Sequence, residues 1–126
     1  MNSIEINLTK TAIKNHEELW PGYQSKAKET DPELIEIFDN WAFDEVISKS
    51  NLDTKTRVMA ILASNIACQA LNEYKMFVNA ALNIEITPVE IKEILYQAVP
   101  YVGIAKVIDF IYITNEVFKE RQIILP

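Results

Sequence analysis

The stretch that decides the fold is residues 52–103, LDTKTRVMAILASNIACQALNEYKMFVNAALNIEITPVEIKEILYQAVPYVG. Its segment 58–63 is apolar all the way round, which is typical of a buried helix rather than a surface one. The segment 87–90, T-P-V-E, has the cap, the first-turn proline and the returning glutamate of a capping box. Asp53 is placed to cap another helix. The stretch therefore predicts capped helices around a buried segment.

The spacing between these two helix starts predicts a further helix. No glycine or proline lies between residues 54 and 83, yet one helix through to Asn83 would be about 45 Å long, too long for a compact domain. We therefore predict a break near residues 69–72. Pro100 should end or kink the helix that starts at residue 88, because proline removes a backbone donor. Gly103 should then open the last helix.

The residues before this stretch are also helical in pattern. Segment 9–30 is amphipathic and is interrupted at 21–22, P-G, where a kink or turn should fall. Asp31 can cap a helix that starts at Pro32. Apolar residues then recur at helical spacing: Leu34, Ile37, Phe38, Trp41 and, one turn later, Val46 or Phe43. Trp41 and Phe43 could line a pocket, but we interpret an aromatic stripe at helical spacing as core. Because apolar/polar alternation is rare, the predicted fold class is all-α, a compact bundle of about six helices in a single domain spanning 1–126.

Composition indicates more apolar surface than an ordinary core needs. Hydrophobic residues make up 49% of the 126 residues, while charged residues stay at 24%. A chain of this length forms one domain with a proper core. The excess indicates a second buried face such as a subunit interface, and the alternative is a well-filled monomer core. The tail 121–126, RQIILP, is expected to pack against a neighbouring subunit or the core.

Charge and cysteine content exclude several classes of function. The net charge is −6 and no basic run is present, so nucleic acid is not an expected partner. No apolar run is long enough to span a bilayer, and the first ten residues lack a signal-peptide pattern, so neither a membrane nor secretion is expected. Cys68 is the single cysteine, which excludes an intrachain disulfide and fits a reducing cytoplasm.

The familiar motifs for phosphate, metal and nucleophile chemistry are missing from the sequence. Two glycines cannot build a phosphate loop. One histidine and one cysteine do not make the usual ligand set of a transition metal. His16, the one histidine, is interpreted as a packing residue on an amphipathic helix. We therefore expect neither a cofactor nor a metal.

What remains is acid/base chemistry by a carboxylate, an amide and a phenol. Glu73 lies at the edge of an apolar helical stripe, where a buried acid would need a partner; alternatively it leans to solvent or pairs with a nearby base. Gln97 and Tyr101 lie one four-residue step apart and can share one side of a helix. Arg57 could join them or simply bond the acid four residues earlier. Asn65, inside the buried helix, should need a hydrogen-bond partner if buried.

Five motifs carry a resemblance to a known family, in a fixed order and spacing. They are L-D-T-K-T-R (52–57), A-S-N-I-A (63–67), E-Y-K-M-F-V-N-A-A-L-N (73–83), T-P-V-E-I-K-E-I-L-Y-Q (87–97) and Y-V-G (101–103). The sequence thereby resembles the carboxymuconolactone decarboxylase family of the alkylhydroperoxidase-like superfamily. This resemblance implies an all-helical fold and a homo-oligomer, commonly a trimer or a hexamer.

The sequence departs from the family's patterns at the positions that carry chemistry. The decarboxylases of the family place a histidine four residues after the glutamate that matches Glu73, and here that position is Phe77. The peroxidase-like branch carries C-x-x-C followed by a histidine, and here those positions are Ala70, Glu73 and Phe77. Cys68 is out of register with both cysteines, so dithiol peroxidase activity is not expected.

Two hypotheses of function follow from these residues and the resemblance. In the first, the protein is a cofactor-free carboxy-lyase acting on a small organic acid or lactone. Glu73 is the general acid/base, Gln97 and Tyr101 orient the substrate, and Arg57 holds a carboxylate. In the second, the protein is a non-catalytic oligomer that binds a small ligand or a partner protein. A Glu73 that lines a closed pocket favours the enzyme, and an exposed Glu73 away from any cavity favours the binding protein.

Overall fold

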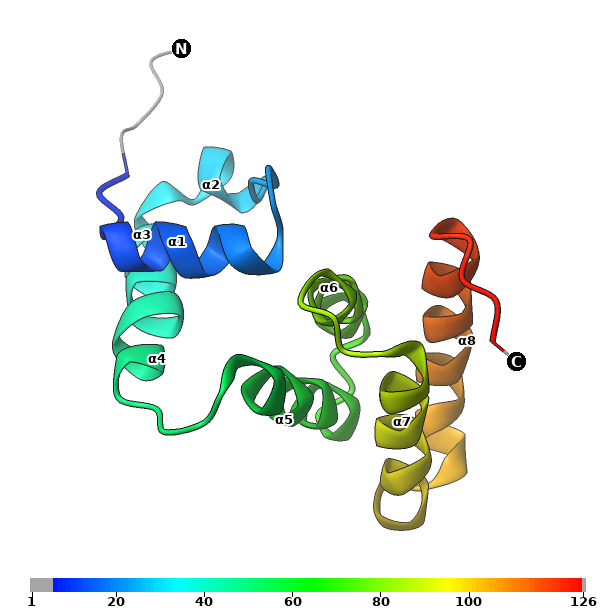
Figure 1. Ribbon diagram of the computed structural model, residues 1–126. Helices are drawn as coiled ribbons and strands as arrows, with labels where there is room; N and C mark the ends of the chain where they lie inside the picture. The colour runs from blue at the N-terminus through cyan, green and yellow to red at the C-terminus, as the bar shows by residue number, and fades with distance from the viewer. Residues whose placement is uncertain (1–5, 126) are drawn as a thin grey trace. The chain divides into compact units, whose positions relative to one another are not determined.

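The computed structural model describes residues 6–125, and within this range every regular element is a helix (Figure 1). The predicted all-α fold class is therefore confirmed. The chain forms two compact units, Met1–Asn51 and Leu52–Pro126. No helix of the described range is long and apolar enough to cross a membrane.

The first unit is built from short helices. They are α1 (Lys10–Leu19), α2 (Ala27–Thr30), α3 (Pro32–Asn40), the π-helix η1 (Trp41–Glu45) and α4 (Val46–Ser48). Thr9 caps α1 by accepting a hydrogen bond from the backbone of Ala12. After α1 the chain turns through Gly22, whose φ of 75° is a left-handed conformation that glycine adopts without strain. The interruption predicted at residues 21–22 is confirmed.

The start of α3 at Pro32 was predicted correctly, but the prediction that Asp31 caps it was wrong. The Asp31 side chain makes no capping hydrogen bond to α3 and instead accepts one from the hydroxyl of Thr30, at 2.8 Å. The Asp31 backbone N–H closes the end of α2 on the carbonyl of Ala27, at 2.7 Å, and its carbonyl accepts from the Ile35 backbone at the start of α3. With φ −135° and ψ 58°, its backbone is outside the extended region from which a side chain caps a helix.

The interior of the first unit gathers around the contact of α1 with η1. Ala12, Leu19, Trp20 and Phe43 are buried. The Asn15 amide donates to the Phe43 carbonyl at 2.7 Å and ties the two elements together. The interpretation of the aromatic stripe as core was correct for Phe43 and wrong for Trp41, which is exposed. The exposed fractions of Leu34, Ile37, Phe38 and Trp41 are 46–68%. A helical period identifies an apolar face but does not say what covers it.

The second unit consists of longer helices packed in pairs. They are α5 (Thr54–Ala67), α6 (Leu71–Asn83), α7 (Pro88–Val102) and α8 (Ile104–Glu120). Helix α5 packs against α6 and α7, and α8 packs against the same two helices (Figure 1). Their facing side chains form a core whose larger members have no exposed area: Val58, Leu62, Ile66, Tyr74, Val78, Ile91, Leu95, Val107 and Val117.

Local signals set the helix ends of the second unit as the sequence predicted. Asp53 caps α5 by accepting from the Thr56 backbone at 2.7 Å. Thr87 and Glu90 form both bonds of the capping box at the start of α7. The predicted break between α5 and α6 is confirmed, and Gln69, with a φ of 62°, turns the chain there.

The prediction that α7 ends at Pro100 was wrong by two residues. The helix runs on to Val102 and ends at Gly103, whose φ is 101°. Pro100 lies in the last turn and is exposed, so the missing backbone donor costs one hydrogen bond at a place where water can reach the freed carbonyl. Gly103 then separates α7 from α8.

A buried polar pair links α6 to α8 inside the second unit. The hydroxyl groups of Tyr74 and Thr114 lie 2.5 Å apart, and Thr114 also donates to the Phe110 carbonyl at 2.7 Å. Tyr74 therefore donates to Thr114. Burial raises the pKa of Tyr74 to about 12, so this phenol stays protonated and keeps its donor.

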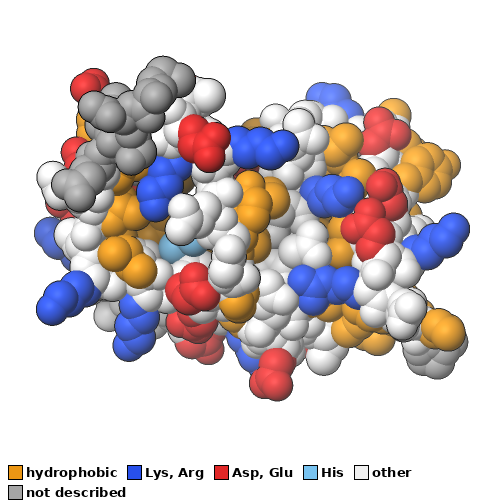
Figure 2. Space-filling model, turned by 90° about the horizontal axis from the view of Figure 1, so that it is seen from above, with side chains coloured by type: hydrophobic (Ala, Val, Ile, Leu, Met, Phe, Trp, Pro, Cys, Tyr) orange, Lys and Arg blue, Asp and Glu red, His pale blue; other side chains and the backbone are white. Residues whose placement is uncertain are grey.

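The surface mixes apolar and charged side chains. Figure 2 shows hydrophobic side chains exposed between Lys, Arg, Asp and Glu on one face of the molecule. In the tail, the Ile123 backbone donates to the Phe118 carbonyl at 2.8 Å, while Ile124 is 92% exposed. Docking of the tail on a neighbouring subunit remains a prediction, and its last residue, Pro126, lies outside the described range.

Candidate functional site

The predicted site residues come from three helices of the second unit. Arg57 lies in the first turn of α5, Glu73 in the first turn of α6, and Gln97 and Tyr101 in the last two turns of α7. The family resemblance and the helical pattern placed them on these elements. Their grouping depends on how the three helices pack.

The structure brings the start of α6 close to the junction of α7 and α8. Gln69, in the turn before α6, donates its side-chain amide to the Ile66 carbonyl at 2.8 Å and to the Lys106 carbonyl at 3.1 Å. Lys106 is in the first turn of α8, directly after the end of α7. Glu73 and Tyr101 therefore belong to the same end of the second unit.

Arg57 lies near the other end of α5. It is ten residues before the end of this helix at Ala67, which is about 15 Å along the helix axis. Glu73 follows the turn after Ala67, in the first turn of α6. That Arg57 shares a site with Glu73 and Tyr101 stays a prediction.

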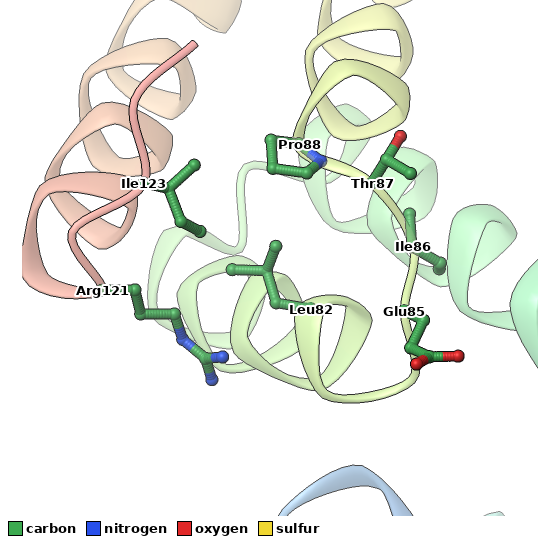
Figure 3. A pocket seen from close by; sticks show the side chains of 7 residues that line it. All are labelled: Leu82, Glu85, Ile86, Thr87, Pro88, Arg121 and Ile123. Atoms are coloured by element: carbon green, nitrogen blue, oxygen red, sulfur yellow. The ribbon is translucent and has the colours of Figure 1, made fainter.

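The predicted site residues at this end are open to solvent. Glu73 and Gln97 are exposed, and Tyr101 is 89% exposed. None of these residues lines either of two pockets in the described part of the second unit. The larger one lies between the end of α6, the start of α7 and the segment after α8 (Figure 3).

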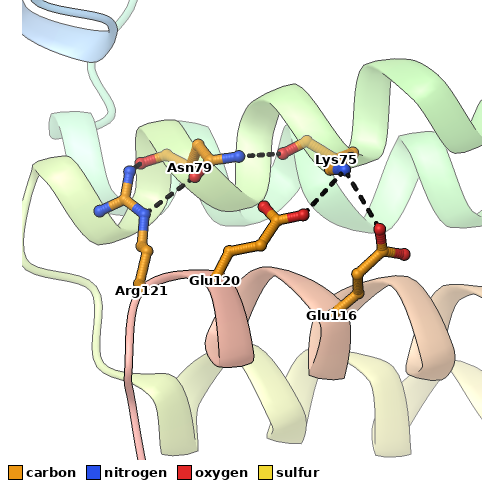
Figure 4. Close-up of polar contacts among 5 residues, drawn as sticks. All are labelled: Lys75, Asn79, Glu116, Glu120 and Arg121. Atoms are coloured by element: carbon orange, nitrogen blue, oxygen red, sulfur yellow. Dashed lines mark hydrogen bonds and ion pairs between the residues drawn. The ribbon is translucent and has the colours of Figure 1, made fainter.

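Lys75, the lysine nearest to Glu73 in the sequence, pairs with acidic residues of α8 instead. Lys75 forms ion pairs with Glu116 at 3.6 Å and Glu120 at 3.5 Å, linking α6 to α8 (Figure 4). These side chains are 36–56% exposed, so the pairs contribute little to stability. Of the alternatives for Glu73, the structure favours a side chain that leans to solvent over one paired with Lys75.

Phe77 occupies the position at which the family's decarboxylases carry histidine. Its side chain is 9% exposed, on the buried face of α6 next to Tyr74 and Val78. A phenyl ring can neither donate nor accept a proton. The structure thus uses this position for packing.

Asn65 is a polar residue of this region whose role the sequence left open. Its side-chain Nδ2 is buried and has no hydrogen-bond partner among the described residues. A buried donor without an acceptor costs about 1–3 kcal/mol. Ser64, its neighbour, is satisfied by the Ala60 carbonyl at 2.8 Å. Asn65 is therefore a candidate donor to an oxygen that a ligand or another chain supplies.

His16 forms a separate cluster in the first unit. Its ring centroid lies 5.0 Å from that of Trp20, 5.1 Å from Phe43 and 6.5 Å from Tyr23. Burial lowers the pKa of His16, and the charge of Asp39 opposes this shift. The aromatic surroundings agree with the interpretation of His16 as a packing residue.

Within residues 6–125 no group of three or more His, Cys, Asp and Glu side chains is arranged to hold a metal ion. The free Cys68 is exposed at the end of α5. Its sulfur donates weakly to the Asn65 carbonyl at 3.8 Å.

Comparison with known families agrees with the fold and the position of this site. The model of the carboxymuconolactone decarboxylase family matches residues 32–116, which is more than half of the chain. The chain belongs to this family. The match includes Glu73, Phe77 and Tyr101 and leaves His16 outside. No curated protein matches the chain significantly.

Proposed function

We propose that this protein is a homo-oligomeric, ligand-binding member of the carboxymuconolactone decarboxylase family that lacks the family's histidine-dependent proton transfer. One observation carries this proposal: Phe77 is buried where the proton-carrying side chain is expected, while Glu73 is exposed. In this proposal the chain keeps the fold of its family but lacks the family's proton transfer at α6.

Chemical reasoning supports the loss of catalysis. Decarboxylation breaks a carbon–carbon bond, releases carbon dioxide and leaves an electron pair that must take up a proton. A positioned acid, held against the substrate and shielded from water, does this best. The Glu73 carboxylate on the first turn of α6 is exposed to water and makes no side-chain hydrogen bond or ion pair with the described residues. This arrangement suits binding better than proton transfer.

The exposed apolar stripe of the first unit supports assembly into a homo-oligomer. Leu34, Ile37, Phe38 and Trp41 follow one another at three- and four-residue steps and therefore share one face of α3 and η1. Contiguous exposed apolar faces of this kind mark interaction sites. We assign this face to a second copy of the chain, in the trimer or hexamer that the family resemblance implies.

A second candidate is the cofactor-free carboxy-lyase. The observation that favours it is the position of Glu73 and Tyr101 at the same end of the second unit, open to a neighbouring copy that could close a site over them. In that case Glu73 donates the proton after carbon dioxide leaves, Gln97 and Tyr101 orient a small organic acid or lactone, and Arg57 holds a carboxylate.

We also propose that the two compact units act as one domain, and that the protein works in the cytoplasm. The second point is supported by the exposed, free Cys68, which suits a reducing compartment.

A turnover screen separates the two candidates. Lactones, small keto acids and hydroperoxides are offered to the wild type, to Glu73→Gln and to Glu93→Gln, a matched change at an exposed glutamate of α7. The binding protein is expected to turn over none of them above background in any form. Turnover that is lost in Glu73→Gln and kept in Glu93→Gln would establish the lyase instead.

A further inference from the structure

We propose that the pocket between the end of α6 and the segment after α8 binds a small apolar carboxylate, with the Arg121 guanidinium holding the carboxylate group. The inference rests on the proposed function in assigning a binding role to this fold. Neither Glu73 nor Phe77 lines this pocket.

The pocket is apolar in its middle and charged at its edge. It has a volume of about 610 Å³ and is lined by Leu82, Glu85, Ile86, Thr87, Pro88, Arg121 and Ile123. Figure 3 shows Leu82, Pro88 and Ile123 around its middle, with Arg121 and Glu85 on opposite sides of Leu82 and their charged ends pointing outward. A short hydrocarbon chain fits the middle, and one charged group fits the edge.

Arg121 is a positive charge that is held in place without being neutralised. Its Nε donates to Asn79 Oδ1 at 2.9 Å and its Nη2 to the Asn79 carbonyl at 3.3 Å (Figure 4). Nη2 also donates to Asn83 Oδ1 at 2.9 Å. All three acceptors are neutral oxygens. No carboxylate of the described residues lies within 4.0 Å of Arg121, and its Nη1 has no hydrogen-bond partner among them.

These contacts favour a carboxylate over other ligands. A guanidinium that is already oriented loses little freedom when it binds, and its planar fork matches the two oxygens of a carboxylate. The other polar groups lining the pocket are occupied. The Thr87 hydroxyl accepts from the Glu90 backbone at 3.1 Å, and the Ile86 N–H donates to the Ala81 carbonyl at 2.9 Å. Recognition of the polar end therefore falls to Arg121.

Glu85 carries a negative charge that should weaken the binding of a carboxylate. Its removal therefore tests the proposal in the opposite direction to the removal of the Arg121 charge. The Glu85 carboxylate also lines the pocket, across Leu82 from Arg121, and its negative charge repels an anion bound there. Removing the Glu85 charge should tighten binding of a carboxylate, whereas removing the Arg121 charge should weaken it. A pocket that merely takes up hydrocarbon would respond to neither change.

The test is a titration of the full chain with hexanoate and with 1-hexanol, followed by calorimetry and by amide chemical shifts in the range 82–88. The wild type is expected to bind hexanoate more tightly than hexanol. Arg121→Gln should weaken hexanoate binding by about fivefold, and Glu85→Gln should strengthen it by about twofold, with hexanol binding unchanged in both. Lys119→Gln removes a neighbouring exposed charge that does not line this pocket and should leave hexanoate binding unchanged.

Three outcomes would overturn the proposal. They are equal binding of hexanoate and hexanol, absence of hexanoate binding by a wild type that is folded, and an Arg121→Gln effect that Lys119→Gln reproduces. Leu82→Trp, which fills the middle of the pocket, should abolish binding of both probes. The oligomeric mass measured on the same samples separates the two proposals, because an oligomer that does not bind hexanoate contradicts only this one, and a monomer that does bind it contradicts the homo-oligomer.

Discussion

The two compact units differ in how much of their apolar surface they hide. The second unit encloses nine large side chains completely, on four helices whose ends are fixed by caps and a capping box. The first unit has short helices and leaves Leu34, Ile37, Phe38 and Trp41 open. The second unit is therefore stabilised by its own core, whereas the first unit has an apolar face suited to assembly.

The largest expected effect is a change within the core of the second unit. Leu62→Ala removes a side chain with no exposed area from α5 and should lower the free energy of unfolding by about 2–5 kcal/mol. Val89→Ala, at a position that is 54% exposed on α7, should change it by less than about 0.5 kcal/mol. Urea denaturation measures both. Similar losses in the two variants would mean that the core is not where the stability resides.

The next effect concerns the exposed face of the first unit. Ile37→Glu places a charge in the middle of the apolar stripe and should dissociate the oligomer, because a buried unpaired charge at an interface is costly. Tyr112→Glu, at a 63% exposed position of the second unit, should leave the assembly intact. Light scattering after gel filtration gives the mass of each. An unchanged mass for Ile37→Glu would remove the role assigned to this face.

A smaller effect separates a helix cap that forms from one that does not. Thr87→Ala removes the hydroxyl that accepts from the Glu90 backbone and should lower the free energy of unfolding by about 1 kcal/mol. Asp31→Ala should cost no more than about 0.5 kcal/mol, because the Asp31 side chain makes no capping bond. Chemical denaturation of both variants is again the measurement. The reverse order would contradict the helix ends described here.

The smallest expected effect is a pH dependence that originates in the first unit. Burial lowers the pKa of His16 below its ordinary value of 6.5, so the unfolded chain takes up a proton at higher pH than the folded one. The contribution of His16 to the free energy of unfolding is therefore fully present above pH 6.5 and declines as the pH falls through 6.5. An NMR titration of the imidazole should give a midpoint below 6.5, and in His16→Gln the stability should lose this pH dependence. A midpoint above 6.5 would show that Asp39 outweighs burial.

Helix starts were predictable from the sequence because they depend on neighbours within a few residues. Asp53 and the capping box at Thr87 formed as predicted, and the break before α6 fell at the expected place. Asp31 does not cap α3 with its side chain because the short helix α2 directly before it holds its backbone outside the extended region. The helix passes Pro100 by two residues because, in the last, exposed turn of α7, the lost bond is inexpensive.

The sequence predicted which helices carry the candidate site residues, but it did not predict how exposed those residues are. A helical wheel placed Glu73 at the edge of an apolar stripe, but its exposure depends on which helices flank α6. The unpaired side-chain amide of Asn65 and the hydrogen bonds that hold Arg121 depend on how residues distant in the sequence pack. Arg121, for example, contacts Asn79 and Asn83. No local pattern encodes these contacts.

The decisive measurement is the release of carbon dioxide from carboxymuconolactone by the purified protein. With Phe77 in place of histidine and Glu73 exposed, the wild type is predicted to release carbon dioxide at the uncatalysed rate and to match Glu73→Gln. A wild-type rate well above background that disappears in Glu73→Gln and persists in Glu93→Gln would contradict the account and identify the protein as a lyase.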